Sequence, residues 1–112
     1  MGKQKKESFE QAKTKQWLQN KLGAYVAKSV VFTEDGNPDL IGCFRSVFFG
    51  IEMKRIGKKT TEDFGARPLQ NEKLRDIAEA GGIAFVAETL DEVKHTLYKE
   101  LIKRGIDPRP MK

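Results

Sequence analysis

The sequence predicts one α/β domain in which a mixed β-sheet is flanked by helices, in the order α-β-β-β-α-β-α. The length of 112 residues fits a single domain, with loose tails expected over 1–7 and 105–112. Segments with strand periodicity alternate with segments of helical periodicity. A predicted hairpin is followed by a strand–helix–strand unit, which combines antiparallel with parallel pairing and so predicts a mixed sheet.

The first predicted helix and strand are bounded by clear signals. The helix is expected to begin at Ser8, a good N-cap, and to end at Leu22, because the glycine that follows is a strong helix stop. The segment Ala24–Phe32 is rich in Val and aromatic residues, which predicts a strand. The turn-forming residues 34–38 then end this strand.

A β-hairpin is predicted from two apolar runs, Asp39–Phe44 and Val47–Arg55, that flank Arg45 and Ser46. Arg-Ser is not a preferred pair for a tight two-residue turn, so loops of two and of four residues both remain open. Strand alternation gives the second run one face that suits burial, formed by Phe49, Ile51 and Met53.

The remaining elements are also delimited by start and stop signals. They are a basic loop over Ile56–Arg67, a helix over 68–81, a strand over Ile83–Ala87 and a last helix that ends near Lys103. Pro68 suits the first turn of its helix. Thr89 and Glu92 have the spacing of a capping box, which predicts where the last helix begins.

Charge and composition restrict the classes of function. The formal net charge is +5, and a basic chain favours a polyanionic partner such as nucleic acid. The single cysteine, Cys43, excludes an internal disulfide and a cysteine zinc site. No segment is long and apolar enough to span a bilayer and no signal peptide pattern opens the chain, so a cytoplasmic protein without a membrane partner is expected.

Pairing within the hairpin brings charged residues together. If the loop is centred on Arg45 and Ser46, Asp39 lies opposite Glu52, with Cβ atoms about 4.5–5.5 Å apart. Alternation places Lys54 on the same face as Glu52, roughly 6.6 Å further along the strand. Two carboxylates and an ammonium group are therefore expected at one end of the hairpin.

This trio has the composition of a metal-assisted phosphodiesterase site. Opposed carboxylates repel each other unless a proton or a cation lies between them, and their hard oxygens suit Mg²⁺, with Mn²⁺ as a substitute. The backbone carbonyl of Met53 is a further candidate ligand, and Lys54 is placed to stabilise charge on a phosphoryl group. Glu-x-Lys is also common on solvated strand faces, so the order and spacing of the three residues carry the prediction.

Two helical residues are candidates for the same site. Glu10 shares a helix face with Thr14 and Trp17, which turns it toward the sheet. Gln70 heads the apolar stripe that continues through Leu74. A polar residue in such a position requires a partner if it is buried, whereas a frayed helix end would leave it in solvent; both interpretations remain open for each residue.

These motifs resemble the PD-(D/E)XK nuclease superfamily, with Pro38-Asp39 as the PD element and Glu52-Met53-Lys54 as the (D/E)XK element. More closely, the chain resembles the phage-type, stand-alone VRR-NUC domain, from about Phe9 to Val93. The matching segments are 36–43, 49–55, 69–70, 81–87 and 91–93.

The resemblance implies a restriction-endonuclease-like core and a Mg²⁺-dependent endonuclease that hydrolyses DNA phosphodiester bonds. It implies Asp39 and Glu52 as metal ligands, Lys54 as the catalytic lysine, Gln70 as the glutamine after the loop, and Glu10 as the first-helix glutamate and a further ligand. Glu7 is the alternative to Glu10, because that helix has little else to fix the register.

The resemblance also implies partners. Small members of this type are similar in design to Holliday-junction resolvases, so a homodimer acting on branched or duplex DNA in a bacterial or phage-infected cell is expected, joined through an edge strand or the last helix. The residues expected to contact DNA phosphates are Lys28, Arg55, Lys58, Lys59 and Arg67. The competing hypothesis is a non-catalytic DNA-binding module or a degenerate nuclease.

Overall fold

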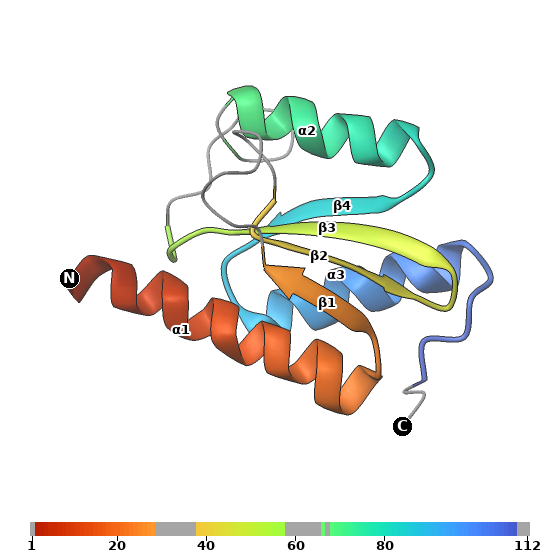
Figure 1. Cartoon of the computed structure of the whole chain (residues 1–112), viewed down its shortest axis with the longest axis horizontal. Coiled ribbons are helices and arrows are strands. Elements are labelled where there is room, and N and C mark those ends of the chain that lie inside the picture. Colours follow the sequence, from red (N-terminus) through yellow and green to blue (C-terminus); the bar gives the residue numbers. More distant parts are fainter. Residues whose placement is uncertain (1, 29–37, 58–65, 67, 110–112) are drawn as a thin grey trace.

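The computed structural model describes residues 2–28, 38–57, 66 and 68–109, with side chains from Phe9 onward. Its architecture is a four-stranded mixed sheet in the order β1-β2-β3-β4. The elements are α1 (Gly2–Gln16), the π-helical η1 (Trp17–Leu22), β1 (Tyr25–Lys28), β2 (Leu40–Phe44), β3 (Val47–Met53), α2 (Pro68–Glu79), β4 (Ile83–Ala87) and α3 (Leu90–Lys103). Figure 1 shows α2 on one face of the sheet and α1 and α3 on the other. The predicted fold class and element order are confirmed.

The β2–β3 hairpin has the predicted register. Leu40 pairs with Ile51 and Phe44 with Val47, so the pairing is centred on the two residues between the strands. Of the two loop lengths left open by the sequence, the structure has the shorter: Arg45 and Ser46 alone form the turn, with φ values of 49° and 72°. Both residues adopt the left-handed conformation of a type I′ turn, whose twist matches that of the two strands. The fold therefore imposes this conformation on residues that do not favour it.

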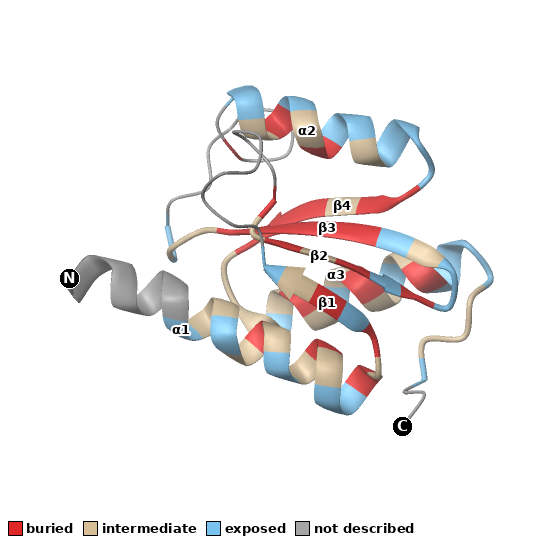
Figure 2. Cartoon of the chain, in the orientation of Figure 1, coloured by how far each residue is buried: buried red, intermediate tan, exposed pale blue. Residues whose placement is uncertain are grey.

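The main core lies between the sheet and the pair α1 and α3. On β3, the predicted inward residues Phe49, Ile51 and Met53 are all buried. They pack with Leu18 and Leu22 of η1 and with α3 side chains in one cluster. Figure 2 shows that β3 and β4 are buried along most of their lengths, because α2 covers their other face.

Several element boundaries differ from the predicted ones. The first helix begins at Gly2 rather than at Ser8, and α2 ends at Glu79 rather than at residue 81. The strand predicted over Ala24–Phe32 is described only as far as Lys28, and its remainder lies outside the described residues. Among the described residues, no helix is long and apolar enough to cross a membrane.

The predicted capping box at the start of α3 is present in modified form. The Thr89 hydroxyl accepts a hydrogen bond from the Glu92 backbone N–H at 3.1 Å, as a capping box requires. The Glu92 carboxylate accepts from the backbone N–H of Glu88, one residue before the cap, at 2.7 Å. This arrangement fixes the chain where it leaves β4 and turns into α3.

Candidate active site

Two hydrogen bonds hold Asp39 beside Glu52 and Met53 at one end of the β2–β3 hairpin. The backbone N–H of Asp39 donates to Glu52 Oε1 at 3.2 Å. The backbone N–H of Met53 donates to Asp39 Oδ2 at 2.8 Å. Asp39 directly precedes β2, so the hairpin register places its carboxylate beside the Glu52 strand. The structure thus brings together the two carboxylates that the sequence predicted to be neighbours.

Lys54 and Gln70 complete a polar cluster with Glu52. The Lys54 ammonium donates to Gln70 Oε1 at 2.8 Å, and the Gln70 amide donates to Glu52 Oε2 at 2.6 Å. The Lys54 ammonium also lies 3.5 Å from Glu52 Oε2. Gln70 therefore bridges the two residues: its carbonyl oxygen accepts from Lys54, and its NH₂ group donates to Glu52. Of the two interpretations of Gln70, the structure supports a partnered residue.

Glu52 is buried in this cluster, with 4% of its surface exposed. Burial and the nearby Asp39 charge raise the pKa of Glu52 to about 7, against the opposing effect of Lys54. The effect of Lys54 on the pKa of Glu52 is thus smaller than the combined effect of burial and Asp39. A pair of carboxylates in which one pKa is raised is suited to bind a cation, because the cation favours the ionised form of both groups.

The position of Gln70 depends on a residue that the sequence analysis did not identify. Asn71 is buried at the start of α2 and exchanges two hydrogen bonds with Ala66 in the preceding segment. Its amide donates to the Ala66 carbonyl at 2.8 Å, and its carbonyl oxygen accepts from the Ala66 N–H at 3.2 Å. The signal in the sequence is a polar residue three positions before Leu74, on the inward face of the helix.

Glu10 has other partners than the carboxylate pair. Its carboxylate accepts from the backbone N–H of Leu90 at the start of α3, at 3.0 Å, and lies 3.3 Å from the Lys13 ammonium. Acceptance at a helix N-terminus is favourable because unpaired N–H groups lie there. The structure therefore does not join Glu10 to the Asp39–Glu52 pair, and the side chain of the alternative, Glu7, lies outside what the structure describes.

The donor set fits a divalent cation held mainly by two carboxylates. Asp39 and Glu52 supply hard oxygen atoms from adjacent positions, which is the chemistry that Mg²⁺ and Mn²⁺ prefer. Across the described part of the chain, no group of three or more His, Cys, Asp or Glu residues is placed to hold a metal. Within that described part, backbone carbonyls such as the predicted one of Met53 are the candidates for further ligands, together with water, which Mg²⁺ commonly retains.

The residues predicted to contact DNA have different positions. Lys28 ends β1 and pairs with Leu40, a core residue, so it lies on the α1 face of the sheet and not on the face of Glu52. Arg55 is half-buried and follows Lys54 directly. The other three, Lys58, Lys59 and Arg67, lie outside the described residues.

Comparison with known proteins identifies the fold. Neither a protein-family model nor a curated protein sequence matches the chain. Among solved structures, one described as "VRR_NUC domain protein" is 23% identical with a TM-score of 0.64, covering 96% of this chain and 97% of that one. Another, described as "VRR_NUC domain", is 25% identical with a TM-score of 0.62, covering 88% and 95%. Because these structures match almost the whole chain, the chain has the fold of a VRR-NUC domain.

Proposed function

We propose that the protein is a divalent-metal-dependent endonuclease that hydrolyses DNA phosphodiester bonds. The observation that carries this proposal is the hydrogen-bonded cluster of Asp39, Glu52, Lys54 and Gln70, in which the buried Glu52 has a pKa raised to about 7. The solved structures that share the fold are described as VRR_NUC domains, which supports the same activity.

Each residue of the cluster has a role in this proposal. Asp39 and Glu52 would hold Mg²⁺, which when bound polarises a phosphoryl oxygen and lowers the pKa of a coordinated water. Gln70 orients the Lys54 ammonium beside Glu52 and restricts its motion. Lys54 then stabilises the negative charge that develops on the phosphoryl oxygens during hydrolysis. Gln70 is thus a positioning residue, whereas Lys54 acts on the reacting group.

The experiment compares cleavage by the wild type with that by Glu52→Gln, Lys54→Ala and Gln70→Ala in the presence of Mg²⁺. The substrates are plain duplex, nicked, flap and four-way-junction DNA. We expect Glu52→Gln and Lys54→Ala to reduce the rate by about 10²–10⁴-fold, because the first removes a metal-binding carboxylate and the second removes a group that stabilises charge. Lys99→Ala, an exposed lysine of α3, is the matched control and should cleave like the wild type.

Two results would contradict the proposal. Cleavage that persists in both site variants would exclude the cluster as the active site. Calorimetry that detects no Mg²⁺ binding by the wild type, together with retained DNA binding, would favour the non-catalytic DNA-binding module instead. Circular dichroism of each variant separates loss of chemistry from loss of folding.

The same proposal includes a homodimer that selects branched DNA such as Holliday junctions. Each protomer contains one cluster, so symmetric cleavage of two strands requires two protomers.

A candidate interface lies on the sheet beside α2. Tyr25, Cys43 and Phe48 pair in one row across three strands, and all three are exposed, Tyr25 by 72% and Phe48 by 45%.

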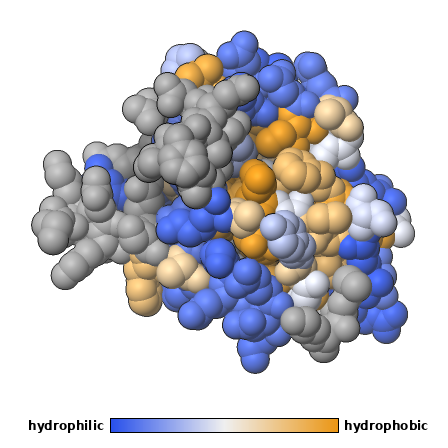
Figure 3. All heavy atoms as spheres, in the orientation of Figure 1, coloured by the Kyte–Doolittle hydropathy of each residue, from blue (hydrophilic) through white to orange (hydrophobic). Residues whose placement is uncertain are grey.

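This open sheet surface suits a second copy of the chain. Figure 3 shows apolar surface gathered between the hydrophilic surfaces of α2 and α1. The exposed row carries no formal charge, and in a chain of net charge +5 an uncharged surface is where two copies meet with least repulsion. The next row, Ala27 and Ile41, is half-buried and leads toward Asp39, so the surface and the cluster share one face.

A further inference from the structure

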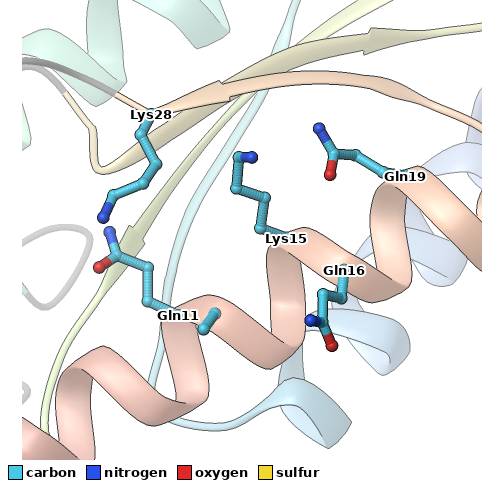
Figure 4. Close-up of a pocket in the computed structure, with 6 residues that line it drawn as sticks. Gln11, Lys15, Gln16, Gln19 and Lys28 are labelled. Atoms are coloured by element: carbon cyan, nitrogen blue, oxygen red, sulfur yellow. The ribbon is translucent and has the colours of Figure 1, made fainter.

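A polar groove lies between α1 and η1 on one side and β1 on the other. Its volume is about 230 Å³. The residues that line it are Gln11, Ala12, Lys15, Gln16, Gln19 and Lys28. Figure 4 shows the Gln11 and Lys28 side chains directed toward each other, with Lys15 extending between the helix and the strand. The groove is outside the cluster of Asp39 and Glu52.

Among the described residues, the side chains that line the groove carry only positive charge. Lys15 and Lys28 both line it, and in the same part of the chain neither forms an ion pair. The segment 2–22, which forms its helical wall, contains six lysines and two glutamates, so its net charge of +4 is most of the chain's +5. Two ammonium groups facing one hollow repel each other, and a bound anion relieves that repulsion.

The groove opens at the end of the sheet that carries the carboxylate pair. Lys28 pairs with Leu40, the residue after Asp39. On the helical side of the groove, Gln11 follows Glu10. The Glu10 carboxylate accepts a hydrogen bond from the Leu90 N–H just beyond β4. The groove and the cluster therefore lie at the same sheet end but on opposite faces, with the β1 edge between them.

We propose that this groove binds the phosphodiester backbone of one strand of a nucleic acid. The inference rests on the proposed function, because it assigns a path to the DNA that the cluster would cleave. Lys15 and Lys28 would pair with successive phosphates, as lysines do in sequence-independent contacts. The amide of Gln11, which Figure 4 shows directed toward Lys28, adds a neutral donor that suits phosphate and sugar oxygens. A positively charged groove between a helix and an edge strand suits the backbone of a single strand, such as an unpaired arm of branched DNA.

The test measures DNA binding without cleavage. A fluorescent oligothymidylate is titrated with each protein in EDTA, and anisotropy gives the affinity at several salt concentrations. We expect Lys15→Ala/Lys28→Ala to weaken binding about tenfold at low salt. The slope of log affinity against log salt should fall by about 0.7 for each phosphate of a single strand that the protein no longer neutralises. The matched control, Lys99→Ala/Lys103→Ala, removes the same charge from exposed positions on α3.

The outcomes separate the groove from general electrostatics. Equal weakening by the two double variants, or unchanged binding by the groove variant, would overturn the proposal. Lys15→Arg/Lys28→Arg should retain affinity, because charge and reach are kept. If the groove variant loses affinity for DNA but the wild type cleaves no substrate, the proposed DNA site in the groove is supported and only the proposed nuclease activity is refuted. Conversely, cleavage that depends on Glu52 with normal binding by the groove variant would refute only the groove.

Discussion

At the scale of single residues, the burial of Glu52 links protonation to stability. Its pKa in the folded protein is raised to about 7 from 4.5, chiefly by desolvation and by Asp39. Between these two pH values the folded state binds more protons than the unfolded state. Stability therefore decreases as the pH rises through this window, which is the reverse of the usual behaviour of a salt-bridged carboxylate.

The prediction compares the wild type with Glu52→Gln in EDTA. From pH 5 to pH 8 the wild type should lose about 3 kcal/mol of unfolding free energy relative to the variant, as the size of the shift requires. Urea unfolding at the two pH values measures this difference. Glu79→Gln, at the exposed end of α2, controls for removal of a carboxylate elsewhere. A wild-type-to-variant difference that does not change with pH would show that Glu52 is not perturbed.

At the scale of elements, the contact between β1 and β2 requires a glycine. A Cβ atom on Gly42 would lie 2.1 Å from the Tyr25 backbone carbonyl and 2.6 Å from the Phe49 ring. A backbone atom of a paired strand cannot move aside as the tip of a side chain can. The edge strand β1, which carries Lys28, is therefore held close to β2 only while position 42 has no side chain.

We expect Gly42→Ala to destabilise the protein by about 1–3 kcal/mol, the usual cost of overpacking. Thermal unfolding should show a decrease of several degrees in Tm for a domain of this size. Cys43→Ala, at the next position, changes an exposed side chain and should leave Tm nearly unaltered. Equal Tm values for the two variants would mean that β1 adjusts without cost.

The parts of the fold that follow from local patterns could be predicted from the sequence. The hairpin register needed only strand alternation and the position of the turn, and it placed Asp39 beside Glu52 as observed. Pro68 and Thr89 begin their helices as their start signals indicate. The sequence predicted that Gln70 is directed toward the sheet, but it did not predict the hydrogen bond to Lys54. That contact depends on how α2 packs against the sheet.

Other features depend on tertiary structure that no local pattern encodes. The left-handed turn at Arg45 and Ser46 contradicts the preference of both residues, since the paired strands determine it. Glu10 was expected to join the carboxylate pair because it shares the sheet-facing side of its helix with Thr14 and Trp17. The same face, however, also meets the start of α3, where the backbone N–H of Leu90 donates a hydrogen bond to the Glu10 carboxylate. Lys15 entered no prediction, because its proximity to Lys28 arises only from the docking of α1 beside β1.

At the scale of the whole molecule, the open sheet surface predicts self-association. The mass in solution, measured by light scattering, should be twice the 12.7 kDa of one chain. Phe48→Lys should shift the protein toward the monomer, because it places a charge in the exposed row. Leu69→Lys is the matched control, since Leu69 on α2 has the same 45% exposure but lies outside the row.

Two further measurements distinguish the possible interfaces. Ile102→Lys, at a 62% exposed position of α3, tests the last helix as the alternative interface. A short bismaleimide should cross-link Cys43 of two copies if the row forms the contact. A dimer that persists in Phe48→Lys but not in Ile102→Lys would assign the interface to α3 instead.

The tight turn of the hairpin has a consequence for evolution of the active site. The turn lies at the opposite end of the strands from Glu52, about 20 Å away at the rise of an extended chain. Because side chains alternate between faces, one inserted or deleted residue in the turn would shift the pairing by one position and direct Asp39 and Glu52 to opposite faces. The number of residues in this distant turn is therefore as much a requirement of the site as the identity of its two carboxylates.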